Sequence, residues 1–364
     1  MPAEGGAKTG GRGTIAGGVK DFIANERAAA AVERSLQREH RPQTYLFVGP
    51  ERVGRATLAC RLAQALNCTS EPSPCGGCSA CRRIAGGIHA DVQTVTLEVS
   101  SEAPQRKAIS VEQVRDIERS VALSPFEGRT RVVIIDPADE MTVTAQNAFL
   151  KTLEEPPPHV VFVLISGQEE RLLETVRSRC QRIGFRLAPV AAIEAALRER
   201  GVGEQTAVLL ARLARGRPGW ALAMAQDPSL LERRRQGLEL ARSLTSMSLA
   251  KRMDLAERLS DDFKRDRETV LALLREWQGW WRDLLLVQSG AEVGVANVDA
   301  ADGLREDAAV CQPAAVQAFL QALGDTRQYL QENVQSRLAL EALLLTAPGY
   351  KLARMEQAPQ PRSA

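Results

Sequence analysis

The sequence predicts an N-terminal α/β part built on a parallel sheet and a C-terminal part made of helices alone. As far as Pro189, short apolar runs of the kind that form buried strands alternate with helical segments. Beyond Pro189 the sequence contains no further strand-like run, and amphipathic helices broken by Gly and Pro follow one another. A chain of 364 residues is long enough for two or three domains.

The composition is that of a folded globular protein, with 44% hydrophobic and 25% charged residues. Residues 1–187 carry 24 basic and 22 acidic side chains, and the remainder carries 23 of each. Neither half therefore has the positive excess expected of a chain that holds nucleic acid by itself. No apolar run approaches the roughly 20 residues that cross a bilayer, and no signal peptide is recognisable, so we expect a cytoplasmic protein without a membrane segment.

In the N-terminal part, the expected strands are apolar runs that stop at a turn residue, as the run before Gly49 does. The expected helices repeat apolar residues three and four apart, and Ser110 suits the start of one of them. Residues 1–18, rich in Gly, are expected to be a disordered lead-in. The predicted elements are helices at 26–37, 55–66, 109–122 and 143–153, and strands at 45–48, 92–99, 132–135 and 160–165.

In the C-terminal part, the predicted helices lie at 191–200, 204–215, 313–331 and 336–345, with a long helical stretch at 229–286 and a polar interruption at 289–307. Trp277, Trp280, Trp281 and Leu284 follow one another at the spacing of one helix face. We interpret this row as a packing stripe rather than as a platform on which bases stack.

A glycine-rich loop follows the first predicted strand. Gly49 and Gly54 have the Gly-x4-Gly spacing of loops that bind nucleotide phosphates through backbone N–H groups. Arg55 stands where such loops carry the lysine that reaches the terminal phosphates, and Ala56 where they carry the hydroxyl that holds magnesium. Thr57 comes one residue late and, on a helix, points about 100° away. The loop geometry is therefore expected without the groups that hydrolysis needs.

The strand at 132–135 ends in an acid, as one strand of such sites does. Asp136 fits the position that supports magnesium, but Pro137 follows it where a working site has the Glu that polarises water. Asp139 and Glu140 lie at other positions of the turn. We therefore predict a degenerate nucleotide site that binds ATP weakly or not at all. Its residues are Gly49, Gly54, Arg55 and Asp136.

Four of the seven cysteines lie within fourteen residues, at Cys68, Cys75, Cys78 and Cys81. Two-residue spacers let neighbouring thiolates converge on one tetrahedral ion, so the spacing predicts a structural zinc site made of cysteines alone. Free buried thiols or a redox pair are the alternatives. The isolated Cys60, Cys180 and Cys311 are interpreted as core or incidental residues.

Several segments resemble those of one family. They are Tyr45–Pro50, Leu66–Cys68 with the cysteine cluster, Asn147–Pro157, Ser178–Cys180 and Arg337–Glu341. Together they resemble the clamp-loader subunits of bacterial DNA polymerase III, which are AAA+ proteins, over roughly residues 20–350.

The resemblance implies an α/β RecA-like P-loop (AAA+) domain with an inserted zinc module. An all-α lid of three helices and an all-α C-terminal collar domain, which joins subunits in a ring, are implied to follow it. The implied bounds are 19–187 for the AAA+ domain, about 67–90 for the zinc module, 188–245 for the lid, 246–350 for the collar and 351–364 for a tail.

The resemblance also implies roles for single residues. Arg179 matches the arginine that these subunits insert into a neighbour's ATP site, where such a group stabilises charge on the transferred phosphoryl group. Arg177 and Arg182 flank it and compete for this role. The position of a nucleotide-sensing arginine in the lid falls on Gly219, and Ser166 matches a first sensor position.

The altered loop implies a subunit without ATPase activity of its own, in a complex whose overall activity is that of a DNA-directed DNA polymerase, a nucleotidyltransferase. Implied partners are the gamma/tau and delta subunits in a ring, and through them the sliding clamp and primed DNA, in DNA replication. Two alternatives stay open. One is an ATP-hydrolysing gamma/tau-type subunit with a variant loop, and the other is a zinc-dependent nucleic-acid-binding protein.

Overall fold

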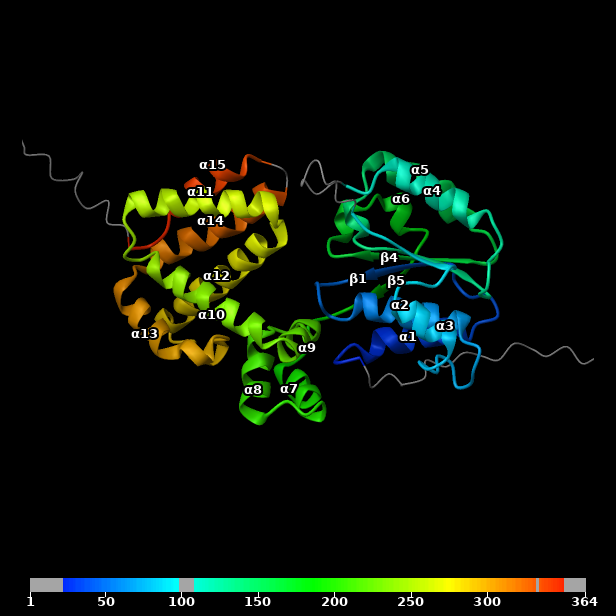
Figure 1. Cartoon of the computed structure of the whole chain (residues 1–364), viewed down its shortest axis with the longest axis horizontal. Coiled ribbons are helices and arrows are strands. Elements are labelled where there is room, and N and C mark those ends of the chain that lie inside the picture. Colours follow the sequence, from blue (N-terminus) through cyan, green and yellow to red (C-terminus); the bar gives the residue numbers. More distant parts are fainter. Residues whose placement is uncertain (1–21, 98–107, 332–333, 350–364) are drawn as a thin grey trace, which may run out of the picture. The chain divides into compact units, whose positions relative to one another are not determined.

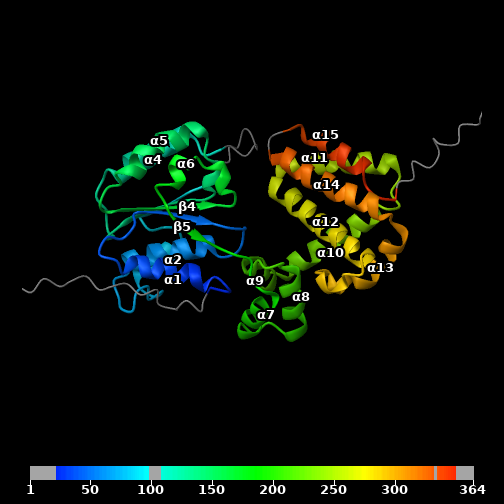
Figure 2. The same cartoon turned by 180° about the vertical axis from the view of Figure 1, so that it is seen from behind.

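A computed structural model of the chain describes residues 22–97, 108–331 and 334–349. The predicted lead-in at 1–18 and tail at 351–364 lie outside these residues. The chain forms two compact units: one runs to Gly201 and includes Ala214–Ala221, and the other comprises Val202–Leu213 and the chain from Leu222 onward (Figures 1 and 2). None of the described helices combines the length and the apolar character that crossing a bilayer requires.

The first unit contains a five-stranded sheet in the order β2-β3-β4-β1-β5, in which every pair of neighbours is parallel. The prediction of a parallel sheet is therefore confirmed. The strands are β1 (Thr44–Val48), β2 (Val92–Val95), β3 (Arg131–Ile135), β4 (Val160–Ser166) and β5 (Gln181–Gly184). Strand β5 was not predicted, because Ile183 is its one buried residue and its place at the edge leaves the others partly exposed.

Helices cover both faces of this sheet (Figure 1). On one face lie α1 (Glu26–Leu36), α2 (Arg55–Asn67) and α3 (Ser79–Ala85), and on the other α4 (Val111–Val121), α5 (Val143–Glu154) and α6 (Glu174–Arg177). Because side chains alternate along a strand, Tyr45 and Phe47 of β1 enter one hydrophobic core and Leu46 and Val48 enter the other. Helix α7 (Val190–Glu199) follows β5.

The second unit is helical throughout its described residues. Its helices are α8 (Glu204–Leu213), α10 (Pro228–Ser243), α11 (Leu249–Arg265), α12 (Arg267–Gln288), α13 (Ala301–Val310), α14 (Pro313–Gln331) and α15 (Ser336–Leu345), and α9 (Pro218–Gln226) continues into it from the first unit. Part of the predicted polar interruption is thus wrong, because α13 begins inside it. The tryptophan row is a packing stripe as predicted, since Trp277, Trp280 and Trp281 are fully buried and Trp281 packs edge-on against Phe319.

One buried arginine ties the ends of this helical unit together. Arg252 is 0% exposed, and its guanidinium donates hydrogen bonds to the carbonyl oxygens of Leu244 (2.6 Å), Ala347 (2.9 Å) and Leu344 (3.0 Å). These carbonyls lie at or beyond the C-terminal ends of α10 and α15. The last carbonyl groups of a helix have no N–H donor within the helix itself, so Arg252 supplies hydrogen bonds that the helices lack. This contact could not be predicted from the sequence, because Leu344 and Ala347 lie 92 and 95 residues from Arg252 in the chain.

A second buried polar group, Asp91, fixes the turn before β3. Its carboxylate accepts hydrogen bonds from the backbone N–H groups of Phe126 (2.7 Å), Glu127 (2.8 Å) and Gly128 (2.7 Å). Arg131 adds an ion pair at 3.2 Å. Burial by itself acts to raise the pKa of Asp91, but these donors outweigh it and hold the pKa below its usual range.

Replacement of this carboxylate, as in Asp91→Asn, is expected to destabilise the first unit by about 2–4 kcal/mol, because buried N–H donors lose a charged acceptor. The effect depends on pH, because the folded state holds Asp91 ionised at a pH at which the unfolded chain already binds a proton. Its stabilisation is complete above the unfolded pKa of about 3.9 and is lost as the pH falls through the lower folded pKa.

Urea unfolding of the wild-type and Asp91→Asn chains at pH 7 and below pH 4 tests this. The stability of the wild-type chain should fall more steeply on acidification than that of the variant. Asp116→Asn, an exposed acid on α4, is the control and should match the wild type at pH 7. Equal stability of both variants at pH 7 would contradict the role given to Asp91.

Candidate functional site: a phosphate loop, an arginine and a cysteine cluster

The loop after β1 has the backbone of a tight turn into α2. A Cβ atom at Gly49 would lie 2.6 Å from the carbonyl oxygen of Phe185, so only glycine fits there. Arg52 and Gly54 have φ values of 60° and 103°, in the left-handed region. Gly54 precedes α2 and, being glycine, has no side chain that could accept hydrogen bonds from the first N–H groups of that helix. Backbone N–H groups at the start of α2 are therefore left to face the loop.

Arg55 and Asp136 are brought together beside this loop. Arg55 is 9% exposed, and burial lowers its pKa although the charges of Asp136 and Asp139 oppose the change. Burial likewise raises the pKa of Asp136 against the attraction of Arg55. Among the described residues, Nη1 of Arg55 has no hydrogen-bond partner. Each side chain thus lies in the electrostatic field of the other, at the place where a working site of this kind holds phosphate and magnesium.

The other polar residues near the strand ends are engaged within the chain. Asp139 accepts hydrogen bonds from the N–H groups of Gly167 (3.3 Å) and Gln168 (3.0 Å), and Glu140 pairs with Arg171 at 3.3 Å. Ser166 is fully buried, and its hydroxyl oxygen accepts from the N–H of Gln168 at 3.1 Å. None of these acids stands directly after β3 in the way that a water-activating Glu would.

The segment around Gly219 lies against the same loop. The N–H of Gly219 donates to the carbonyl oxygen of Arg52 at 2.9 Å, and a Cβ atom at Gly219 would lie 2.9 Å from that oxygen. A side chain at the predicted sensing position would therefore collide with the loop. Asn25, which sequence reasoning missed, is 4% exposed and donates to the carbonyl oxygens of Val53 (3.3 Å) and Arg186 (3.0 Å). It closes the loop from the other side.

Arg179 lies at the opposite edge of the sheet. It lies between α6 and β5, two residues before that strand begins, and its carbonyl oxygen accepts a hydrogen bond at 2.6 Å from the hydroxyl of Thr44, the first residue of β1. Gly49 follows the last residue of the same strand. About 13 Å of strand separates the two ends, since a strand rises about 3.3 Å per residue. Arg179 therefore cannot serve the chain's own loop.

Arg179 and Arg182, two of the three arginines of this segment, have different partners. Nη1 of Arg179 donates to the carbonyl oxygen of Thr175 at 2.7 Å, and Nη2 forms an ion pair with Glu154. Arg182 grips Glu169 with two hydrogen bonds of 2.7 Å each, and this contact raises the pKa of Arg182. A bidentate pair of this kind is stronger than a single hydrogen bond. Arg182 is therefore less available than Arg179 for contact with another molecule.

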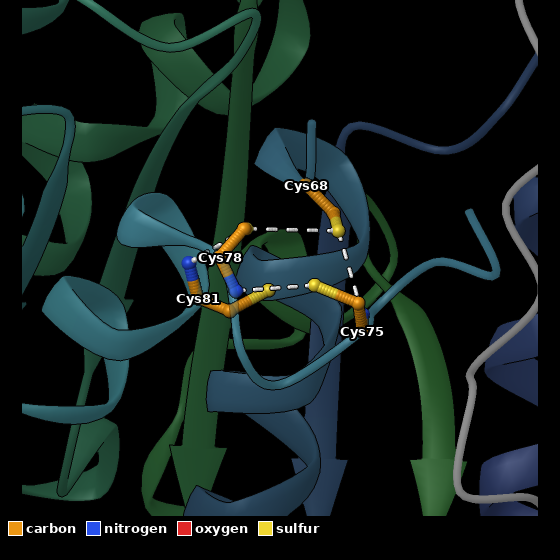
Figure 3. Close-up of side chains that lie close together, drawn as sticks. All are labelled: Cys68, Cys75, Cys78 and Cys81. Atoms are coloured by element: carbon orange, nitrogen blue, oxygen red, sulfur yellow. Dashed lines mark hydrogen bonds between the residues drawn. The ribbon is translucent and has the colours of Figure 1, made fainter. Parts of the chain in front are cut away.

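The four cysteines of the predicted cluster meet in space (Figure 3). All four sulfur atoms lie within 4.8 Å of one another, and those of Cys68 and Cys78 are 3.9 Å apart. Zinc binds thiolates at about 2.3 Å in a tetrahedron, in which neighbouring sulfurs are about 3.8 Å apart. Cys68 ends α2 and Cys78 begins α3, so the two helix ends hold the cluster together. The donor set fits a single zinc ion.

Backbone N–H groups donate hydrogen bonds to several of these sulfur atoms, an arrangement that stabilises the ionised thiolate form. The N–H of Cys78 donates to the sulfur of Cys75 at 3.2 Å and lowers its pKa. For Cys78, burial is outweighed by the N–H groups of Thr69 and Cys81, and its pKa falls to about 5. Burial raises the pKa of Cys81 to about 12. A cation at the centre is what would allow all four thiols to ionise together.

Removal of metal is expected to lower the melting temperature of the chain by roughly 5 °C or more, because the turn between α2 and α3 would lose the ion that holds its four cysteines together. Metal content measured by mass spectrometry, with thermal melting before and after chelation, tests this. Cys78→Ser should lose the metal, whereas Cys60→Ser, a cysteine outside the cluster, should keep it. An unchanged melting temperature of metal-free protein would contradict a structural metal.

Comparisons with known proteins agree with this architecture. Residues 24–189 match the sequence family described as "DNA polymerase III, delta subunit". The gamma/tau subunit of DNA polymerase III from Mycobacterium bovis is 28% identical over 353 residues, which cover 89% of this chain and 59% of that protein. The delta prime subunit from Bacillus subtilis is 27% identical over 322 residues, or 88% and 94% of the two chains. The delta prime subunit from Pseudomonas aeruginosa is 39% identical over 145 residues, which cover 39% of this chain and 43% of that protein.

These findings confirm the resemblance predicted from the sequence: the chain is similar to gamma/tau and delta prime subunits of DNA polymerase III. It spans about 59% of the length of the gamma/tau relatives. By contrast, it aligns with 94% of the length of the delta prime subunit of B. subtilis.

Proposed function

We propose that this chain is a delta prime-type subunit of the DNA polymerase III clamp loader that hydrolyses no ATP itself and supplies Arg179 to the ATP site of a neighbouring gamma/tau-type subunit. The main support is the position of Arg179, which lies at the edge of the sheet opposite the chain's own phosphate loop. A partly exposed arginine on a short rigid segment suits insertion into a second protein, where it would stabilise charge on the transferred phosphoryl group.

The chain's own loop supports the inert half of this proposal. Arg55 stands in place of a lysine and is subject to the opposite charge of Asp136, and Ala56 offers no oxygen for magnesium. Pro137 replaces the residue that would polarise water, and Gly219 packs where a sensing side chain would stand. Hydrolysis would need a metal ligand and a positioned water at this loop, and the described residues offer neither in the usual place.

The remaining roles follow from the family. We infer that the chain joins gamma/tau and delta subunits in a ring through a helical collar at 246–350, with a lid at 188–245. Through that ring it would take part in loading the sliding clamp onto primed DNA in the cytoplasm. Zinc at Cys68, Cys75, Cys78 and Cys81 would then have a structural role, because all four positions are filled by protein ligands.

Arg179→Ala in a reconstituted loader is the test of the trans role. The ATP site that Arg179 faces is expected to lose about 10³-fold of its rate, as other sites do when an inserted arginine is removed. The rate of ATP hydrolysis by the complex, with clamp and primed DNA present, should fall by at least the fraction of the total rate that this one ATP site contributes. Arg177→Ala and Arg182→Ala are matched controls. A larger loss from either control than from Arg179→Ala would move the role to that arginine.

The chain alone, with magnesium and ATP, is expected to show no turnover above background, because Ala56 and Pro137 leave magnesium and water without their usual partners. A phosphate-release assay on the purified chain decides this point. Turnover that is lost in Asp136→Asn would show that the loop is active, and a gamma/tau-type motor subunit would then replace the present proposal.

A further inference from the structure

The partner of Arg179 within the chain is Glu154, the last residue of α5. Nη2 of Arg179 forms an ion pair with its carboxylate, and Nη1 donates to the carbonyl oxygen of Thr175 in α6. The two helices pack against each other on one face of the sheet (Figure 1). The guanidinium is thus held from two directions while its side chain remains 32% exposed.

Both groups that bind this guanidinium among the described residues are oxygen atoms with a full or partial negative charge. Glu154 brings a full charge, and its position at the C-terminus of α5 adds the negative end of that helix. Thr175 contributes a carbonyl oxygen from the last turn of α6. A phosphate brought by another subunit would therefore meet an arginine that is already neutralised, and would be repelled by the Glu154 carboxylate beside it.

We propose that Glu154 is a positioning residue that holds Arg179 in a waiting position and is exchanged for the phosphate of the neighbouring subunit's nucleotide. This inference rests on the proposed trans role of Arg179. The contact with Thr175 is uncharged, so it can persist through the exchange and keep the guanidinium aimed. The exchange replaces one charge-assisted hydrogen bond by another, so the cost of releasing Arg179 is small.

The exposure of both partners sets the size of the effect. The side chains are 32% and 48% exposed, and ion pairs of this kind hold their partners only weakly. Removal of the Glu154 charge should therefore raise kcat/KM for ATP at the neighbouring site by about 2–5-fold, because Arg179 no longer has to be released. The gain should shrink as salt is added, since salt screens an exposed pair in the wild-type chain.

The experiment compares Glu154→Gln with Glu155→Gln in the reconstituted loader, with ATP hydrolysis measured at low and high salt. Glu155 is an exposed neighbour that forms no ion pair among the described residues, so its variant makes the same change in charge without touching Arg179. Only Glu154→Gln should raise kcat/KM. In a background of Arg179→Ala, Glu154→Gln should have no effect, because the group it restrains is gone.

Three results would overturn the inference: an unchanged or lower kcat/KM for Glu154→Gln, an equal gain from Glu155→Gln, or a gain that persists without Arg179. A lower value would mean that the carboxylate aims the arginine rather than restrains it. Failure of the proposed trans role is distinguishable, because Arg179→Ala alone would then leave turnover unchanged. If Arg179→Ala lowers turnover and Glu154→Gln does not raise it, only the role of Glu154 is wrong.

Discussion

The burial of both faces of one parallel sheet determines where every functional group of the first unit can lie. All seven residues of β4 and all five of β1 are buried, so neither strand offers a polar side chain to solvent along its length. Chemistry is therefore confined to the two edges at which the strands begin and end. The phosphate loop lies where the strands end, at their carboxyl termini, and Arg179 lies where the strands begin. The length of β1 separates the two. A subunit built in this way can offer its arginine only to another molecule.

The same burial governs the loop itself. A charged side chain that is 91% removed from solvent needs compensation, and Arg55 obtains it from acids of its own chain. In a working site the negative phosphates of the bound nucleotide would provide that compensation. Here Asp136 shares the task, and Asn25 and Gly219 close over the loop from either side. The polar groups around the loop therefore serve the folded chain, in agreement with the nucleotide site without hydrolysis that we propose.

Polar anchors extend this arrangement to the cysteine cluster. Asn67, at the end of α2 and one residue before Cys68, is 2% exposed and binds the backbone of Thr130 and Arg129 through its side-chain amide. Asp91 binds the neighbouring residues of the same turn. Helix α2 therefore has the phosphate loop at its start and the cluster at its end, and both ends are fixed to the sheet. A metal in the cluster would stabilise the end of this helix rather than take part in chemistry.

The sequence by itself determined the strands β1, β3 and β4, most of the helices, the loop and the cysteine cluster, because apolar runs, helical spacing and short motifs are local patterns. Its motifs also predicted the resemblance to subunits of DNA polymerase III that the comparisons confirm. The tertiary structure alone decided the edge strand β5, whose single buried side chain leaves no pattern, and the partners of the buried polar groups Asn25, Asp91 and Arg252. It also decided that Arg179 pairs with Glu154 and lies away from the chain's own loop. Hydrophobic burial is encoded by neighbours in sequence, whereas a buried charge or amide is satisfied by whichever residues the fold brings beside it, such as residues 35 positions away for Asp91 and 161 positions away for Asn25.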